Sequence, residues 1–202
     1  MQRIGIMGGT FDPIHYGHLV TAEQARFTFG LDRVVFVPTG RPPHKQEKDV
    51  SEAEHRLTMT RLATQSNVHF GVSSIEVDRP GPTYAIDTVR EFKQLYPPGT
   101  ELLFITGADA VLQMTGWKDY DVLMQLCEFV AATRPGYVLE HERIAQMFGP
   151  NASKINFFEV PALAISSTDI RARVRSGRPV RYLLPDVVID YIFASKLYTC
   201  SR

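Results

Sequence analysis

Residues 8–18 read GGTFDPIHYGH and place two histidines three residues apart, shortly after a pair of glycines. This stretch follows RIGIM (3–7), a short apolar run typical of a strand, and precedes LVTAEQARFTFG (19–30), which is typical of a helix. A strand that passes through a glycine-containing segment into a helix is typical of a parallel α/β sheet. The stretch therefore decides both the predicted fold and the place where we expect a site.

The rest of the chain repeats this order of strand and helix. Runs of β-branched and aromatic residues predict strands over 3–7, 33–38, 68–77, 101–107, 128–134 and 155–161. Helical periodicity predicts helices over 18–29, 51–66, 84–96, 119–126, 139–148, 167–176 and 186–196. The alternation predicts an α/β fold, a Rossmann-like doubly wound parallel sheet with helices on both faces. We expect a single domain over 1–202 whose C-terminal part, about 163–202, forms a small helical subdomain.

Composition excludes several classes of protein. The 202 residues are 44% hydrophobic, and 22 Lys and Arg balance 22 Asp and Glu, which gives no support for binding nucleic acid or a membrane surface. Cys127 and Cys200 lie far apart without the spacing of a metal site or a disulfide framework. No apolar stretch is long enough to span a membrane, and Met1 leads directly into a predicted strand. We expect a cytoplasmic protein.

The segment 8–18 is predicted to bind phosphate. In doubly wound sheets, ligands bind outside the carboxyl ends of the strands, where this segment lies. Gly8 and Gly9 are expected to let the backbone turn tightly and approach a ligand. His15 and His18, at i and i+3, are expected to face one anion and stabilise the charge of a leaving group. The alternative is that one histidine caps the helix and the other packs against the sheet.

Other known phosphate and metal patterns are absent from the sequence. Neither the dinucleotide pattern G-x-G-x-x-G nor the P-loop pattern G-x-x-x-x-G-K-[ST] is present. No cysteine, third histidine or carboxylate completes a zinc set at the histidine spacing, so no metal site is predicted.

A second candidate phosphate site lies about 150 residues later. Ser166, Ser167 and Thr168 form an N-cap cluster before a predicted helix, and Arg171 follows one turn in. Free amides, hydroxyls and a guanidinium that converge on one point bind phosphate well. The alternative is an ordinary serine-capped helix with a surface arginine.

The amino-acid sequences of these motifs resemble those of a known family. GGTFDPIHYGH (8–18) and ISSTDIR (165–171) resemble the two signatures of the nucleotidyltransferase superfamily. PPHK (42–45), GPTYAIDT (81–88), GADA (107–110), Trp117 and TRPG (133–136) together resemble the bacterial nicotinate mononucleotide adenylyltransferases. The resemblance implies transfer of the adenylyl group of ATP to nicotinate mononucleotide, giving nicotinic acid adenine dinucleotide and pyrophosphate in NAD biosynthesis.

The resemblance also implies residue roles. His15 and His18 are expected to be catalytic. The residues expected to bind ATP are Gly8, Gly9, Thr10, Phe11, His15, His18, Gly107, Arg134, Ser166, Ser167, Thr168 and Arg171. Those expected to bind nicotinate mononucleotide are His44, Lys45, Thr83, Tyr84, Asp109 and Trp117. Plainer alternatives exist for Arg134, as a surface turn arginine, for Asp109, as an N-cap, for Trp117, as a core residue, and for His44 and Lys45, as solvated loop charges.

We expect direct in-line displacement, since no cysteine or Ser-His-Asp arrangement stands near the motifs as a covalent nucleophile. Mg²⁺ is expected to arrive on the ATP phosphates with water as its other ligands. Two other functions stay open at this point: another small nucleotidyltransferase, such as a phosphopantetheine adenylyltransferase, and a nucleotide-sensing protein without turnover. Assembly into a homo-oligomer also stays open.

Overall fold

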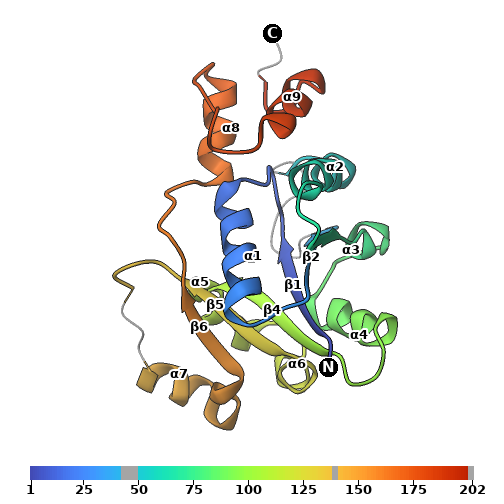
Figure 1. Cartoon of the computed structure of the whole chain (residues 1–202), viewed down its shortest axis with the longest axis vertical. Helices are drawn as coiled ribbons and strands as arrows, with labels where there is room; N and C mark the ends of the chain where they lie inside the picture. The colour runs from blue at the N-terminus through green and yellow to red at the C-terminus, as the bar shows by residue number, and fades with distance from the viewer. Residues whose placement is uncertain (42–49, 138–140, 200–202) are drawn as a thin grey trace.

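The computed structural model describes residues 1–41, 50–137 and 141–199. Within them, strands form one parallel sheet in the order β3-β2-β1-β4-β5-β6 (Figure 1). The strands are β1 (Arg3–Gly9), β2 (Arg33–Pro38), β3 (Phe70–Val72), β4 (Glu101–Gly107), β5 (Glu128–Thr133) and β6 (Ile155–Glu159). The chain winds outward from β1 to β3 and then from β4 to β6 on the other side. The order therefore reverses between β1 and β4, where such sheets bind ligands.

Helices connect the strands and cover both faces of the sheet. They are α1 (Tyr16–Thr28), α2 (Ala53–Thr64), α3 (Ile75–Asp78), α4 (Ala85–Leu95), α5 (Ala108–Val111), α6 (Tyr120–Leu126), α7 (His141–Phe148), α8 (Ser167–Arg175) and α9 (Asp186–Ala194). Two short 3₁₀ helices are η2 (Met114–Gly116) and η3 (Gly149–Lys154).

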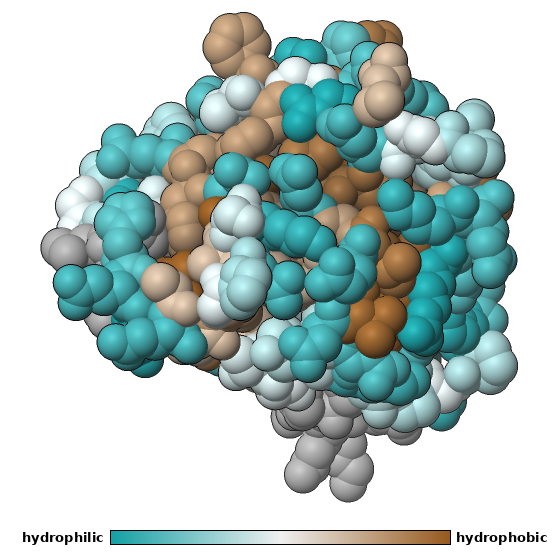
Figure 2. Space-filling view, turned by 90° about the horizontal axis from the view of Figure 1, so that it is seen from below, coloured by the Kyte–Doolittle hydropathy of each residue, from teal (hydrophilic) through white to brown (hydrophobic). Residues whose placement is uncertain are grey.

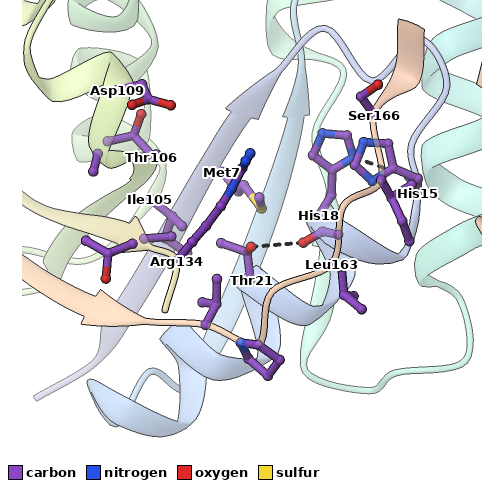
Figure 3. Close-up of a pocket in the computed structure, with 18 of the residues that line it drawn as sticks. Met7, His15, His18, Thr21, Ile105, Thr106, Asp109, Arg134, Leu163 and Ser166 are labelled. Atoms are coloured by element: carbon purple, nitrogen blue, oxygen red, sulfur yellow. Dashed lines mark hydrogen bonds between the residues drawn. The ribbon is translucent and has the colours of Figure 1, made fainter. Parts of the chain in front are cut away.

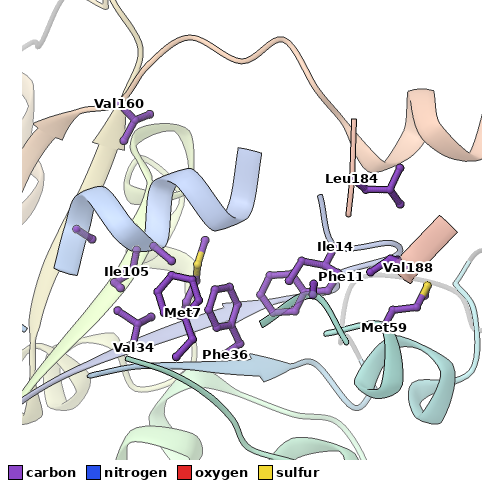
Figure 4. Close-up of a cluster of buried hydrophobic side chains, with 14 of the residues drawn as sticks. Met7, Phe11, Ile14, Val34, Phe36, Met59, Ile105, Val160, Leu184 and Val188 are labelled. Carbon is purple, nitrogen blue, oxygen red and sulfur yellow. The ribbon is translucent and has the colours of Figure 1, made fainter. Parts of the chain in front are cut away.

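Two hydrophobic cores lie on the two faces of the sheet. Successive side chains of a strand point to opposite faces, so Val34 and Phe36 of β2 join one core while Val35 and Val37 join the other. The first core holds residues of α1, α2, α8 and α9, and Figure 4 shows part of it between the sheet and these helices. The second core holds residues of α4, α5, α6 and α7. The predicted doubly wound sheet with helices on both faces is confirmed.

Helix α4 illustrates how the sequence pattern places an element. Ile86, Val89 and Phe92 are buried on one face of the helix, and Tyr96 packs partly buried beside them. This spacing of three residues keeps the apolar side chains on the stripe that faces the sheet. Burial of each large apolar side chain stabilises the fold by about 1.5–3 kcal/mol.

The predicted strand over 68–77 is wrong in length. Only Phe70–Val72 forms β3, and Ile75–Asp78 forms helix α3. The chain leaves the sheet at a pair of serines, where the Ser74 hydroxyl donates a hydrogen bond to the Asp78 carboxylate (2.7 Å). That contact joins residues four apart and so favours a helical turn over continued strand.

The C-terminal helices α8 and α9 lie beyond one end of α1 (Figure 1). Their buried residues, such as Ile170 and Val188, belong to the same core as Met7 and Phe36 of the sheet. Seen from below, the surface is largely hydrophilic, with apolar side chains gathered in a band that hydrophilic residues cross (Figure 2). Among the helices described, none has the length and apolar character needed to cross a bilayer.

Candidate active site

A cavity of about 590 Å³ opens at the carboxyl ends of β1, β4, β5 and β6 (Figure 3). Helix α1 and the start of α8 close its other sides. It therefore lies at the reversal of strand order, where the fold predicts a ligand. Predicted site residues that line it are Gly8, His15, His18, Gly107, Asp109, Arg134, Ser166 and Ser167.

The two histidines lie against each other at the start of α1. Their rings stack with centroids 3.7 Å apart and planes inclined by 26°. His15 is the N-cap residue, and its backbone N–H donates to Nδ1 of His18 (3.2 Å). An Nδ1 that accepts a hydrogen bond leaves the proton of a neutral imidazole on Nε2, so His18 offers an Nε2–H donor. Among the described residues, no group bonds the buried Nδ1 of His15.

Burial makes both imidazoles poor bases. Loss of solvent lowers the pKa of His15 to about 4. The pKa of His18 is lowered to about 3, first by burial and then by the neighbouring His15. Both rings are therefore neutral at pH 7 when the cavity holds no anion. Phe11, 2% exposed, packs edge-on against His18, with ring centroids 5.1 Å apart.

The turn before the histidines differs from the expected glycine turn. Gly8 and Gly9 continue β1, and the residue with positive φ is Phe11 (49°). A Cβ on Gly9 would lie 2.7 Å from the Phe11 ring, so glycine is needed there for close approach rather than for turning. The expectation that these two glycines form the turn is therefore wrong.

Hydrogen bonds join the two signature segments. The Ser167 hydroxyl donates to the carbonyl of Pro13 (2.8 Å), and Nη1 of Arg171 donates to the carbonyl of Asp12 (2.7 Å). Ser166 is the N-cap of α8, and its hydroxyl accepts from the backbone N–H of Asp169 (3.1 Å). These bonds, between residues more than 150 positions apart in the chain, hold the two signature segments together beside the cavity.

Not every residue of these two segments faces the cavity. Gly9, Thr10, Phe11, Thr168 and Arg171 do not line it. The Thr10 carbonyl accepts a hydrogen bond from Nη1 of Arg56 (2.9 Å). Besides its bond to the Asp12 carbonyl, Arg171 lies 3.9 Å from the Asp12 carboxylate.

Three further predicted residues reach the cavity from the ends of β4 and β5. Gly107 ends β4 and is the N-cap residue of α5, which leaves Asp109 inside that helix rather than at its cap. The N-cap alternative for Asp109 is therefore wrong. Arg134 follows β5 and lines the same cavity (Figure 3).

The residues expected to bind the mononucleotide base lie outside this cavity. The N–H and hydroxyl of buried Thr83 both donate to the carbonyl of Arg41 (3.1 and 3.3 Å). Tyr84 is the N-cap residue of α4, and Nζ of Lys118 lies 4.6 Å from the centre of its ring. Trp117 is half-buried against Phe104 of β4, with ring centroids 6.0 Å apart. His44 and Lys45 lie outside the described residues.

Sequence reasoning missed two buried polar residues beside the signature turn. Asp12, 3% exposed, accepts hydrogen bonds from the Tyr198 hydroxyl (2.6 Å) and the Ser51 backbone N–H (3.2 Å). Arg56 is 1% exposed on α2. A signal for Arg56 was present, since it precedes Met59 and Ala63 by three and seven residues on the buried face of that helix.

Comparison with known proteins agrees with this geometry. Residues 6–173 match the family described as cytidylyltransferase-like. A protein of Moorella thermoacetica named a probable nicotinate-nucleotide adenylyltransferase is 56% identical over 97% of this chain and 91% of its own length. The chain belongs to the nicotinate-nucleotide adenylyltransferase family. A second member, from Thermoanaerobacter sp., is 56% identical over 97% of this chain and 94% of its own length.

Solved structures share the fold. The nicotinic acid mononucleotide adenylyltransferase of Plasmodium falciparum superposes with a TM-score of 0.79 at 21% identity, covering 98% of both chains. It has been solved complexed with APC and complexed with NaAD. The two chains therefore share this fold at low sequence identity.

Proposed function

We propose that the protein transfers the adenylyl group of ATP to nicotinate mononucleotide, releasing pyrophosphate and forming nicotinic acid adenine dinucleotide for NAD biosynthesis. One observation carries the proposal: both signature segments meet at a single cavity, joined by the bonds from Ser167 to Pro13 and from Arg171 to Asp12. Full-length similarity to family members supports the same reaction.

The reaction needs two polyanions held in line. The phosphate of the mononucleotide attacks the α-phosphorus of ATP, a P–O bond forms, and the bond to pyrophosphate breaks. His18 is placed to donate its Nε2–H to phosphate oxygens, and His15 lies stacked beside it. Both rings would stabilise the charge that develops as pyrophosphate leaves. In-line positioning supplies the rest of the rate enhancement.

The remaining ATP contacts are assigned to cavity-lining groups. The start of α8 presents backbone N–H groups that lack partners within the helix, and the positive end of the helix dipole, beside Ser166 and Ser167. The Arg134 guanidinium enters from β5 with a second positive charge. Arg171 acts on the phosphates through its hold on the Asp12 turn, and Gly8 and Gly107 leave room for the nucleotide.

Nicotinate mononucleotide, the acceptor, is assigned to a different set of residues. The Asp109 carboxylate suits ribose hydroxyls, and the indole of Trp117 offers a flat face to the pyridine ring. The N-terminus of α4 at Thr83 and Tyr84 suits the carboxylate of nicotinate.

Mg²⁺ fits the cavity only as an ion carried by phosphate. Asp109 is the one carboxylate among the described residues that line it, and those residues contain no cluster of metal-binding side chains. When bound with ATP, Mg²⁺ would neutralise phosphate charge, with water as its other ligands. We further propose one domain with a helical C-terminal subdomain, located in the cytoplasm and without nucleic-acid or membrane partners.

A product assay tests this function. The purified protein is incubated with ATP and Mg²⁺ plus nicotinate mononucleotide, nicotinamide mononucleotide or phosphopantetheine, and dinucleotide and pyrophosphate are measured. We expect pyrophosphate release that depends on nicotinate mononucleotide. Preference for phosphopantetheine would assign a different nucleotidyltransferase, and nucleotide binding without release of pyrophosphate would identify a sensor.

A further inference from the structure

One buried arginine outside the cavity joins three segments of backbone. Arg56 on α2 donates Nε–H to the carbonyl of Ser51 (2.9 Å), Nη1–H to that of Thr10 (2.9 Å) and Nη2–H to that of Gly40 (3.0 Å). Its side chain is 1% exposed, so these bonds are made without competition from water. A planar guanidinium with five N–H donors can bridge three carbonyls in fixed directions, which an ammonium cannot do.

The carbonyls of Thr10 and Gly40 belong to the two halves of the proposed site. Thr10 lies in the signature segment that leads to the paired histidines. Gly40 precedes Arg41, whose carbonyl accepts both hydrogen bonds of Thr83 at the start of α4. Arg56 is therefore the shared anchor of the segment assigned to ATP and the segment assigned to the acceptor.

The acceptor-side contact is closely packed. A Cβ on Gly40 would lie 1.9 Å from the backbone oxygen of Glu76, so only glycine allows the chain that follows β2 to pass α3 at this distance. Glu76 itself is 7% exposed and accepts a hydrogen bond from the Thr88 hydroxyl (2.6 Å) on α4. A shift of Gly40 would thus be passed to both α3 and the start of α4.

The Arg56 guanidinium is a buried charge with acidic groups near it. Burial lowers the pKa of the Arg56 guanidinium, whereas Asp12, Tyr198 and Glu76 raise it. Asp12 beside the signature turn and Glu76 beside the α4 segment both favour the charged form of Arg56, and an arginine stays protonated under such conditions. This arrangement is costly to build unless its geometry is used, because burying a charge carries a desolvation penalty.

We propose that Arg56 is a positioning residue that fixes the distance and orientation between the ATP subsite and the acceptor subsite, so that the attacking phosphate oxygen stands in line with the α-phosphorus. The proposal rests on the proposed adenylyl transfer. Its consequence is specific: without the bridge, each substrate still binds to its own segment, but the two reacting atoms are misaligned. Small misplacements of this kind lower rates by up to about 100-fold.

Arg56→Lys tests the bridge, because it keeps the positive charge and removes the three-way contact. The quantities measured are kcat at saturating ATP and nicotinate mononucleotide, and the Kd of each ligand alone, with a non-hydrolysable ATP analogue for the nucleotide. We expect kcat to fall at least tenfold while each Kd changes by less than about threefold. Thermal unfolding is recorded for every variant.

Arg79→Lys is the matched control. Arg79 is also largely buried on the neighbouring segment, but it bonds the side chains of Glu91 and Thr88 rather than the backbone of either subsite. We expect Arg79→Lys to lower the unfolding temperature without lowering kcat. Arg56→Gln, whose amide reaches fewer carbonyls, is the second variant if Arg56→Lys does not fold.

The outcomes separate the two proposals. Lack of activity in the unsubstituted protein overturns the proposed function itself. If that protein is active, an unchanged kcat in the Arg56 variant, or a Kd for either substrate that rises in step with the loss of kcat, overturns the positioning role. Failure of both Arg56 variants to fold at low temperature assigns the residue to stability alone and also overturns it.

Discussion

The imidazole rings of His15 and His18 are stacked 3.7 Å apart, and the backbone N–H of the first donates to Nδ1 of the second. Two protonated rings could not hold this distance without a counter-ion, since like charges at such separation repel strongly. The lowered pKa values, about 4 and about 3, agree with a neutral pair. The arrangement positions hydrogen-bond donors for an anion while avoiding repulsion before the anion arrives.

We predict that His18→Ala lowers kcat/KM by about 100-fold or more, equivalent to about 3 kcal/mol of transition-state stabilisation. The fold should survive, because His18 is only partly buried and its backbone bonds within α1 remain. His69→Ala, at an exposed histidine near β3, is the control and should keep full activity. Near-normal turnover by His18→Ala would remove this residue from the mechanism.

The histidine pair also predicts how stability depends on pH. In the unfolded chain each histidine takes up a proton below about pH 6.5, whereas the folded chain does so only near pH 4 and pH 3. Stability from the neutral pair is therefore complete above about pH 6.5 and is lost as the pH falls towards 4. Each histidine contributes a slope of up to about 1.4 kcal/mol per pH unit in this range.

Urea unfolding between pH 4.5 and pH 7 measures that slope. We expect His18→Gln, which removes one titrating ring, to show a smaller loss of unfolding free energy on acidification than the unsubstituted protein. Equal slopes in the two proteins would show that His18 titrates normally in the folded chain.

Much of the fold could be predicted because its pattern is local. The alternation of apolar strands with helices, and the stripe of Ile86, Val89 and Phe92, can be seen within windows of ten to fifteen residues. The prediction of a strand over 68–77 is wrong because the alternation of apolar and polar residues continues into Ile75–Asp78. There a hydrogen bond between the side chains of Ser74 and Asp78 favours a helical turn. Periodicity alone does not register such a contact.

For the site, too, the local features could be predicted and the long-range contacts could not. Both signature segments could be located from their residues, but the bonds that join Arg171 to Asp12 and Arg56 to Thr10 and Gly40 connect distant parts of the chain. A charged residue within a helix is usually solvated, so nothing local distinguishes Arg56 from a surface arginine except its place on the buried face. Burial of that charge becomes visible only once the elements are packed.

We predict that Arg171→Lys raises the KM for ATP and lowers kcat, with little change in the KM for nicotinate mononucleotide. Nη1 of Arg171 bonds the Asp12 carbonyl and Nη2 lies 3.5 Å from the Thr168 hydroxyl, and lysine cannot reproduce this planar fork. Arg173→Lys, on the same helix and paired with Asp169, serves as the control. Unaltered ATP kinetics together with a lower unfolding temperature would limit Arg171 to bracing the turn.

The Tyr198 hydroxyl is predicted to stabilise the signature turn from the C-terminal segment. It donates to the buried Asp12 carboxylate at 2.6 Å, and burial together with that carboxylate raises the pKa of the phenol. Tyr198→Phe should lower the unfolding free energy by about 1–3 kcal/mol, as expected for a lost hydrogen bond to a charged group. Tyr191→Phe, which removes a bond to His55 (2.8 Å), should cost less. Equal losses would argue against a special role for Asp12.

The last prediction concerns the choice between nicotinate and nicotinamide mononucleotides. The two bases differ by a carboxylate against a neutral amide, so preference must come from groups that stabilise the negative charge. The N-terminus of α4 is such a group, because no side chain caps its first N–H groups at Tyr84 and the helix dipole places its positive end there. We expect the acid to be favoured at least about tenfold in kcat/KM, which corresponds to about 1.4 kcal/mol.

Substitutions at the two ends of α4 test this assignment. Tyr84→Asp places a negative charge at the N-terminus and should erode the preference, whereas Tyr96→Asp places the same charge at the C-terminal end and should leave the ratio unchanged. Trp117→Ala should weaken both substrates in similar proportion, since a stacked ring does not distinguish carboxylate from amide. Equal use of both mononucleotides by the unsubstituted protein would contradict the role of the helix end, whatever the result at Trp117.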